Sequence, residues 1–286
     1  MILVIDAGNT KADWALADRG ALAGTAATKG ISPYFNTPKE ITALAEEAAV
    51  ALGRPNPQAV YYYGTGCQDA RKQQIVQRVL QEVFSGSHHV EVLDDLTGAG
   101  RALFGHQRGL AIISGTGSNA GIIYQGVVTK KTRSLGYLLG DEGSGSHIGF
   151  AFLKALLLDK LPDDIASAFY QKCELKATDL LSHLYSLKKP QTYAASWVPF
   201  ISGYAKHPVI RSIVSESFDA MVSIMIKPML EGEPPEIPIG ACGGGASVFK
   251  EEMELAFDRR GLSLQKIVGS PIHGLVDYHL AQQGHH

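Results

Sequence analysis

One short pattern occurs twice in this chain: an apolar run, a glycine-rich turn and a second run with strand character. The first copy, ILVIDAGNTK, begins at residue 2, and the second, LAIISGTGSN, begins at residue 110, an offset of 108. Few letters are identical, but the order of strand, turn and strand is the same, as expected for an internal repeat. We therefore expect two related halves, each opening with a glycine hairpin.

The elements predicted around the two copies are those of an α/β fold. After the first copy, periodicity predicts strands at 12–18 and 21–28, a helix near 38–53, a strand at 58–63, a helix near 69–84, a strand at 89–93 and a helix at 95–104. Over 110–130 the second copy extends into three strands joined by turns, and a mostly helical insertion follows at 144–230, which includes 207–230. The chain then continues with a strand and triple-glycine turn within 237–249, a further strand and a closing helix. Two such halves predict a cleft between them, which is the usual place for a ligand.

The composition excludes several classes of function. The 286 residues are 45% hydrophobic and 19% charged, with a net charge of −2, so no basic surface for nucleic acid is expected. No apolar run reaches the ~18 residues of a membrane span, and the opening MILVIDAGNT lacks the basic region of a signal peptide. Cys67, Cys173 and Cys242 lie far apart without metal-ligand spacing, which predicts a cytoplasmic protein without a thiolate-bound metal. The terminal GHH carries no weight in this interpretation.

The two glycine turns, DAGNTK at 6–11 and SGTGSN at 114–119, are either ordinary hairpin turns or phosphate-binding loops. Glycines in both turns would let backbone N–H groups converge on an anion, and threonine or serine hydroxyls would add donors. Their occurrence in equivalent places favours phosphate binding. Neither is a Walker P-loop, because GxxxxGK[ST] is absent, and neither is a dinucleotide fingerprint, because each turn leads into a strand.

Phosphoryl transfer also needs a residue that orients a metal ion and a base near the acceptor hydroxyl. Asp6 ends the first strand beside its turn, a suitable place to hold hydrated Mg²⁺. Asp95 begins the helix at 95–104, where it is either the helix cap or a carboxylate directed towards a substrate. The GGG at 243–245 precedes a helix and is either a tight turn or a flat backbone surface for adenine.

The stretch LGYLLGDEGSGSHIG at 135–149 places two adjacent acids among five glycines. Glycine is used where the backbone must adopt positive φ or approach another group closely. We therefore expect this loop to approach a ligand, with Asp141 as a ligand-binding carboxylate. Glu142 either binds the same ligand or holds the loop.

Taken in order, these segments resemble the N-acetylglucosamine kinase and BadF/BadG-type ATPase family of the sugar kinase, heat-shock chaperone and actin superfamily. The resemblance extends over nearly the whole chain through DAGNTKADWAL, GISPY, YYYGTGC, DDLTGAGRAL, SGTGSN, LGYLLGDEGSG, GGGA and SPIHGLVDYH, of which GDEGSG is the most specific. It implies an α/β fold of two ribonuclease H-like, actin-like ATPase domains with a cleft between them. The expected N-terminal domain is 1–105, closed by a helix at 272–286, and the C-terminal domain is 106–271 with the helical insertion.

The same resemblance implies a role for each matching residue. ATP would be bound by Gly8, Asn9, Thr10, Lys11, Gly115, Thr116, Gly117, Gly243, Gly244 and Gly245, and Mg²⁺ would be held through water by Asp6. The sugar would be bound by Ser32, Asp95, Ser118, Asn119, Gly136 and Asp141, with Asp95 as the catalytic base that takes the proton of the acceptor hydroxyl. Asp94 is the less favoured candidate for the base.

Three positions depart from the family pattern: Asn9 where Ser or Gly is usual, Ser32 where Asn is typical, and Leu135 where eukaryotic members carry an aromatic residue. The implied activity is ATP-dependent phosphorylation of an amino sugar, N-acetylglucosamine, without nucleic-acid or membrane partners and, as in many family members, in a homodimer. ATP and the sugar would bind on opposite sides of a cleft that closes. The sequence leaves open which sugar is used and which hydroxyl is phosphorylated.

Three alternatives remain at this point. A type III pantothenate kinase is suggested by the opening MILVIDAGNTK, which Asn9 fits better, although GDEGSG and the helical insertion count against it. A BadF-type activator ATPase would hold an iron–sulfur cluster, for which the three scattered cysteines show no paired pattern. A binding module without catalysis is disfavoured because Asp6, Thr10, Asp95 and Thr116 are all retained.

Overall fold

The computed structural model describes residues 1–283 and contains two five-stranded sheets. The chain forms two compact units. The N-terminal unit comprises Met1–Ala111, Gly121–Lys130 and the chain from Ser270 onwards, and the C-terminal unit comprises Ile112–Ala120 and Lys131–Gly269. The division at residues 105 and 106 stays a prediction about domains. The predicted extension of the last helix to residue 286 and the terminal GHH lie outside the described residues.

The sheet of the N-terminal unit has the strand order β3-β2-β1-β4-β5. Strands β1 to β3 form an antiparallel meander, and β4 and β5 run parallel to β1. Apolar side chains fill both faces of β1 and β4, as expected for strands covered on two sides. The bounds are β1 Ile2–Ala7, β2 Lys11–Asp18, β3 Ala21–Lys29, β4 Ala59–Gly64 and β5 His89–Asp94.

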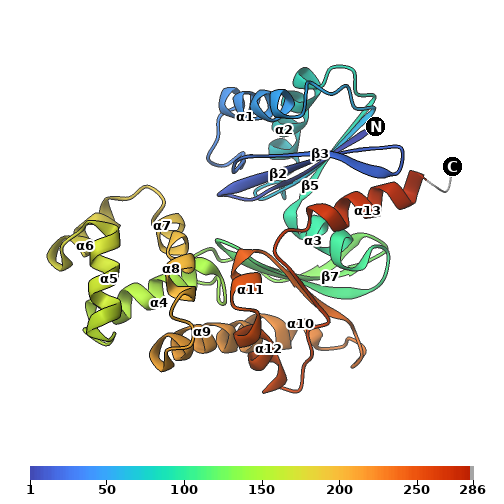
Figure 1. Cartoon of the computed structure of the whole chain (residues 1–286). Coiled ribbons are helices and arrows are strands. Elements are labelled where there is room, and N and C mark those ends of the chain that lie inside the picture. The colour runs from blue at the N-terminus through green and yellow to red at the C-terminus, as the bar shows by residue number, and fades with distance from the viewer. Residues whose placement is uncertain (284–286) are drawn as a thin grey trace. The chain divides into compact units, whose positions relative to one another are not determined.

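Helices cover this sheet on both faces (Figure 1). On one face α1 (Pro38–Ala51) and α2 (Ala70–Val83) pack on a core that includes Leu3, Ile5 and Trp14. On the other, α3 (Asp95–Phe104) and α13 (Ile272–Gln283) pack on the side chains of the alternate strand residues. The last helix of the chain therefore closes the unit that the first strand begins.

Local signals explain where these helices begin. Helix α1 opens with a capping box, in which the Thr37 side chain accepts from the Glu40 N–H and the Glu40 carboxylate accepts from the Thr37 N–H at 2.7 Å. Helix α3 is capped by Asp94, whose Oδ1 accepts from the Thr97 N–H at 2.8 Å. The cap interpretation of Asp95 was therefore wrong, because its neighbour makes the cap and Asp95 is the first residue of the helix.

The second sheet has the strand order β8-β7-β6-β9-β10. When β6 to β10 are matched in turn with β1 to β5, this is the strand order of the first sheet. Strands β9 and β10 run parallel, as β4 and β5 do. The expected duplication of an α/β unit of ribonuclease H type is therefore confirmed by the topology. The bounds are β6 Gly109–Ser114, β7 Ser118–Tyr124, β8 Val127–Lys131, β9 Ile239–Cys242 and β10 Lys266–Val268.

The predicted helical insertion is present in the C-terminal unit and has its own aromatic core. Phe169 lies 4.3 Å from Trp197 and 5.5 Å from Phe152 between ring centroids. The helices are α4 Gly145–Leu157, α5 Asp163–Cys173, α6 Ala177–Ser186, α7 Pro190–Ser196, α8 Val198–Ser202 and α9 Pro208–Met221, and α11 Gly244–Val248 and α12 Lys250–Asp258 follow β9.

Within the helical stretch predicted over 207–230, α9 is followed by a π-helix, η1 (Val222–Ile226), and then by α10 (Lys227–Leu230). The Lys227 N–H donates to the Val222 carbonyl five residues back. Pro228 supplies a physical reason, because it has no N–H and its ring would clash in an α-helix with the carbonyl of Ile224. The wider π turn accommodates the proline without ending the helix.

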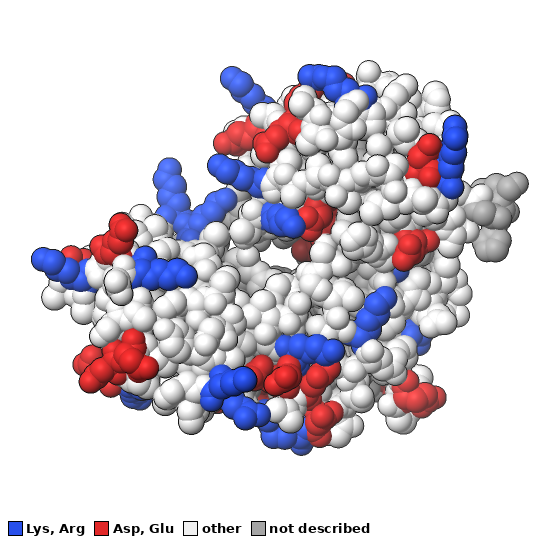
Figure 2. Space-filling model, viewed as in Figure 1, with Lys and Arg blue, Asp and Glu red and all other residues white. Residues whose placement is uncertain are grey.

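The surface carries charges of both signs. On the face shown in Figure 2, basic and acidic side chains are interspersed among uncharged residues, without a large basic region. Within residues 1–283, no helix combines the length and the apolar character needed to cross a bilayer.

Candidate functional site

The first glycine turn connects β1 to β2 and is closed by a hydrogen bond from the Gly8 N–H to the Lys11 carbonyl at 2.9 Å. The side chains of Asn9, Thr10 and Lys11 are exposed. Gly30 lies behind the turn, where a β-carbon would come within 2.4 Å of the Gly8 carbonyl oxygen, and its N–H donates to the Thr10 carbonyl at 3.0 Å. Gly30 therefore packs against one side of the turn, and the exposed side chains on its other side are open to a ligand.

Two carboxylates lie at the base of this turn. Asp6 on β1 is directly opposite Asp13 on β2. Burial, followed by the charges of Asp13 and Asp95, raises the pKa of Asp6 to about 7, against an opposing effect of Lys11. Asp13 also binds Lys11, with Nζ and Oδ1 2.6 Å apart, and accepts from the Ser270 hydroxyl at 3.1 Å. Asp13 was not predicted as a site residue, although it lies within the matching DAGNTKADWAL segment.

This arrangement fits an outer-sphere magnesium ion. Mg²⁺ keeps several waters in proteins and is bound through one or two carboxylates. Burial and the negative charges of Asp13 and Asp95 raise the pKa of Asp6. A cation near Asp6 would offset these effects and favour its ionised form. Among residues 1–283, no three His, Cys, Asp or Glu side chains gather into a group that could chelate a metal directly.

Asp95 lies at the first turn of α3, beside the end of β4. Its carboxylate accepts hydrogen bonds from the Thr65 hydroxyl and from the backbone N–H groups of Asp95 and Leu96. Burial and the neighbouring charge of Asp94 outweigh these bonds and raise the pKa of Asp95 to about 6. Because Asp94 makes the helix cap, the Asp95 carboxylate is available to act as a proton acceptor near neutral pH.

Thr65 was not among the predicted site residues. It follows β4 directly in the quoted segment YYYGTGC, and its N–H donates to the Ala7 carbonyl at 3.0 Å. Thr65 therefore connects the end of β1 with the Asp95 carboxylate. The motif contained the signal, but only the parallel pairing of β4 and β5, in which Gly64 is opposite Asp94, shows that Thr65 lies beside the Asp95 carboxylate.

The GISPY loop lies against the residue that follows Thr65. A β-carbon on Gly66, whose φ is 81°, would come within 2.7 Å of the Tyr34 ring and 3.1 Å of the Ser32 Oγ. Ser32 is buried, and its N–H donates to the Asn36 side chain at 2.9 Å. Its predicted sugar contact stays a prediction.

Tyr34, which sequence reasoning missed, is 60% exposed beside this loop. Lys72 holds the loop in place through its ammonium group, which lies 4.9 Å from the centre of the Tyr34 ring and donates to the Pro33 carbonyl at 2.8 Å. A rigid, exposed aromatic ring next to Gly66 is the kind of surface on which a sugar ring stacks.

In the C-terminal unit, the second glycine turn is closed by a hydrogen bond from the Gly115 N–H to the Gly117 carbonyl at 3.0 Å. The GDEGSG loop packs directly on it. The Gly145 N–H donates to the Gly115 carbonyl at 2.8 Å, and the Ser146 N–H donates to the Thr116 carbonyl at 3.1 Å. Two motifs about thirty residues apart therefore form one structure, in which the first N–H groups of α4 bind the second glycine turn.

Asp141 has a strained backbone, with φ of 61°, which is uncommon for residues other than glycine. Its Oδ1 accepts from the Ser118 N–H at 3.4 Å, and a β-carbon on Gly117 would lie 2.9 Å from Oδ2. The pKa of Asp141 is raised above its usual value, mainly by burial. The hydrogen bond from the Ser118 N–H opposes this shift, and the charge of Glu142 adds to it. Strain of this kind is found at ligand-binding positions.

The three glycines at 243–245 meet the end of β6. Gly243 has φ of 114°, and a β-carbon there would lie 2.4 Å from the Ser114 carbonyl oxygen. A β-carbon on Gly245 would lie 2.6 Å from the Ser114 hydroxyl, whereas one on Gly244 would meet nothing within 4 Å. Gly243 and Gly245 are therefore required by packing within the protein, and Gly244 presents open backbone.

Of the remaining predicted sugar contacts, Ser118 is buried and its hydroxyl lies 3.6 Å from the Met225 sulfur. Asn119 uses its side-chain oxygen within the protein, accepting from the Thr132 hydroxyl at 2.9 Å and from the Ala120 N–H at 3.0 Å. Its amide nitrogen is the part that could reach a ligand. Gly136 adopts φ of 67° at the start of the loop that leads to Asp141.

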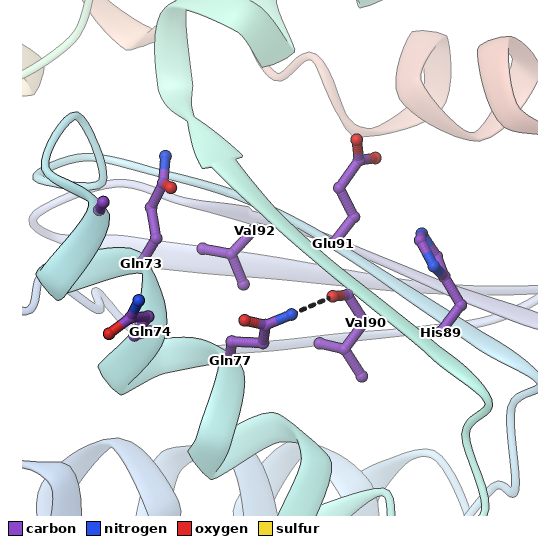
Figure 3. A pocket seen from close by; sticks show the side chains of 8 residues that line it. Gln73, Gln74, Gln77, His89, Val90, Glu91 and Val92 are labelled. Atoms are coloured by element: carbon purple, nitrogen blue, oxygen red, sulfur yellow. Dashed lines mark hydrogen bonds between the residues drawn. The ribbon is translucent and has the colours of Figure 1, made fainter.

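Two of the hollows among the described residues are similar in size. One, of about 320 Å³, lies beside Ser118 and Asp141 in the C-terminal unit. The other, of about 330 Å³, lies between α2 and the edge strand β5, where Gln77 donates to the Val90 carbonyl at 2.8 Å (Figure 3). The second hollow contains none of the predicted site residues. The first hollow contains the predicted residues Ser118 and Asp141.

No protein-family model and no curated protein matches this chain. Among solved structures, a Porphyromonas gingivalis protein proposed to be an N-acetylglucosamine kinase is similar with a TM-score of 0.93 and 33% identity, over 99% of this chain and 100% of that one. A Chromobacterium violaceum protein with the same proposed name is similar in fold, with a TM-score of 0.72 and 18% identity over 97% and 98% of the two chains. MreB 5 of Spiroplasma citri, bound to AMPPNP, has a TM-score of 0.63 and 14% identity over 99% and 96%.

Proposed function

Because this chain belongs to the N-acetylglucosamine kinase family within the actin-like ATPase superfamily, we propose that it transfers the γ-phosphate of ATP to a hydroxyl of an amino sugar, N-acetylglucosamine. Family membership supports an ATP-dependent carbohydrate kinase. The particular sugar, the Mg²⁺ requirement, a cytoplasmic location and a homodimer are further parts of the proposal.

The observation that carries the proposal is the environment of Asp95. A general base works best when its pKa lies near the working pH, and burial beside Asp94 raises the pKa of Asp95 to about 6. The Thr65 hydroxyl and two backbone N–H groups fix its carboxylate without protonating it. Asp95 is thereby suited to accept the proton of the acceptor hydroxyl, as a kinase requires.

ATP is assigned to the glycine motifs. Backbone N–H groups and the hydroxyls of Thr10 and Thr116 would bind the phosphates, and Lys11, oriented by Asp13, would add a positive charge. The open backbone at Gly244 would lie against the adenosine. Asp6 would hold Mg²⁺ through water, and the ion would neutralise charge on the transferred phosphate.

Candidate sugar contacts are assigned in each unit by itself. In the C-terminal unit, Asp141, with its strained backbone, would accept hydrogen bonds from sugar hydroxyls, with Ser118 and Asn119 beside it. In the N-terminal unit, Ser32 in the GISPY loop would contact the sugar, and Tyr34 would provide the aromatic surface for which Leu135 is unsuited.

The test is release of ADP from ATP and Mg²⁺ in the presence of N-acetylglucosamine, N-acetylmuramic acid, glucosamine, glucose or pantothenate. We expect N-acetylglucosamine to give the largest stimulation and a sugar phosphate to form in amounts equal to ADP. Stimulation by pantothenate alone, or ADP release without any phosphorylated acceptor, would contradict the proposal. The first outcome would favour a pantothenate kinase and the second an activator ATPase.

A further inference from the structure

The hollow beside Asp141 is lined by residues of two kinds. The polar and charged residues, called the polar wall, are Ser118, Thr132, Arg133, Ser134, Asp141 and Glu142. The apolar residues, called the apolar wall, are Leu135, Leu139, Ile224, Met225, Pro228 and Met229. All of these residues belong to the C-terminal unit. Apolar side chains together with converging polar groups are typical of a small-molecule pocket.

Part of the apolar wall is open to solvent, while Met225 and Met229 are buried. Leu139 is 76% exposed, Ile224 is 60% exposed and Leu135 is 52% exposed. Single exposed apolar residues are common, but several at the rim of one hollow mark a surface that binds another molecule. Binding of a ligand to the polar wall alone would not explain why these apolar side chains are exposed beside it.

The π-helix η1 contributes directly to this wall. In η1 and α10, Ile224 and Met225 are followed by Pro228 and Met229, and all four line the hollow. π-Helical turns are rare and occur frequently at functional sites. The π turn therefore contributes Ile224 and Met225 to the lining of the hollow that also contains Asp141, which is a second reason to regard the wall as a binding surface.

A plain hexose matches these walls poorly. It has oxygen substituents around its ring, and a hydroxyl placed against the apolar wall would lose water without gaining a hydrogen bond. An acyl chain on the sugar would instead gain from leaving water. Met225, only 3.6 Å from the Ser118 hydroxyl, and Met229 are flexible side chains that can adapt to chains of different length.

We infer that this apolar wall binds the N-acyl substituent of the sugar and that the protein accepts acyl groups longer than acetyl. The inference rests on the proposed function, since it assumes that the sugar hydroxyls face Asp141. It goes beyond that function by identifying the specificity surface and by predicting that N-propanoyl- and N-butanoylglucosamine are substrates.

The experiment compares kcat/KM for glucose, glucosamine and the N-acetyl, N-propanoyl and N-butanoyl derivatives of glucosamine. We expect kcat/KM to hold or to rise along the acyl series, by up to about fourfold for each added CH₂ that becomes buried. A drop of about tenfold or more from acetyl to propanoyl, the size expected of a pocket closed to one more methylene, would overturn the inference.

A matched pair of variants tests the wall itself. Ile224→Trp places a large ring at the rim of the hollow, while Leu181→Trp makes the same change at an exposed position of α6 outside it. We expect Ile224→Trp to lower kcat/KM for the butanoyl sugar by about tenfold or more relative to glucose, and Leu181→Trp to leave the ratio unchanged. An equal effect of Ile224→Trp on every sugar would overturn the inference.

Calorimetric binding of the same sugars distinguishes failure of the acyl-pocket inference from failure of the proposed function. If glucose and glucosamine are phosphorylated without any preference for acyl groups, the sugar kinase proposal stands and the acyl pocket is wrong. If no sugar is phosphorylated, the proposed function is wrong. The acyl pocket is then supported only if affinity holds or rises from acetyl to butanoyl in the wild type and Ile224→Trp removes that trend.

Discussion

At the residue scale, two adjacent carboxylates at the start of α3 have separate tasks. Asp94 caps the helix through Thr97, and Asp95 points its carboxylate at the Thr65 hydroxyl. The sequence LDDL contains both residues but does not show which one makes the cap, because either position is compatible with a helix start. Hydrogen-bond geometry decides between them.

The first prediction concerns the loss of the base. We expect Asp95→Asn to lower kcat by about a hundredfold to ten-thousandfold, the usual contribution of a general base, while ATP affinity stays near that of the wild type. Steady-state kinetics and nucleotide titration measure the two quantities. Because Asp95 does not cap α3, the variant should also fold normally. A large loss of thermal stability with intact turnover would contradict the assignment.

The second prediction concerns pH. A base works only when ionised, so kcat/KM should fall as the pH drops below the pKa of Asp95, about 6 in the free protein. Asp94→Asn removes the neighbouring charge that raises this pKa and keeps a side chain that caps helices well. We therefore expect the acid limb of the profile to move to lower pH in Asp94→Asn. An unchanged limb would show that another group controls it.

At the scale of elements, the site is assembled from turns that close on one another. The GDEGSG loop forms backbone hydrogen bonds with the second glycine turn, and the GGG turn packs on Ser114 at the end of β6. Both contacts bring backbone to backbone, so a side chain has no room at Gly243 or Gly245. The adjacent Gly244 is free of this constraint, which offers an internal control.

The third prediction uses this contrast. Gly243→Ala places a β-carbon at positive φ and against the Ser114 carbonyl, so we expect a loss of about 2 kcal/mol or more in stability and weaker ATP binding. Gly244→Ala should leave thermal unfolding unchanged and still raise the KM for ATP, because the added methyl would lie where the adenosine is proposed to bind. A normal KM for ATP in Gly244→Ala would show that this turn does not bind the adenosine.

At the scale of the whole molecule, the end of the chain completes the unit begun by its first strand. Helix α13 packs through Ile272, Leu275 and Val276 on a core that includes Ile2 and Val4. His279 on this helix bonds the Tyr63 hydroxyl at 2.7 Å and stacks on Tyr61 with ring centroids 3.6 Å apart. A buried histidine therefore holds the C-terminal helix to the central strands.

The fourth prediction follows from that burial. Burial, with the charges of Arg101 and His89, lowers the pKa of His279 to about 3, so the folded chain keeps it neutral while an unfolded chain would protonate it below about 6.5. Between these values the unfolded state binds more protons, and stability must fall as the pH falls. From pH 6.5 to 4.5 this one residue should cost about 2 to 3 kcal/mol.

His279→Gln removes the titrating group and can still bond the Tyr63 hydroxyl. We expect urea unfolding of the N-terminal unit to depend less on pH in this variant than in the wild type between pH 4.5 and 6.5. The difference should disappear above pH 7, apart from a constant offset. Equal slopes in the two proteins would show that His279 is not the group responsible.

The sequence by itself determined the repeated succession of strand, glycine turn and strand along the chain and the position of the helical insertion, because apolar periodicity and glycine spacing are local properties of the chain. Tertiary structure decided the rest. The pairing of β4 with β5 places Thr65 beside Asp95, and the packing of one loop on another places Tyr34 beside Gly66. Hydrogen-bond geometry assigns the cap to Asp94, and packing separates Gly244 from its neighbours. The π turn at Val222–Ile226 was also missed, since a helical pattern does not reveal how the backbone accommodates Pro228. Contacts between residues distant in the chain depend on register and packing, which no local pattern encodes.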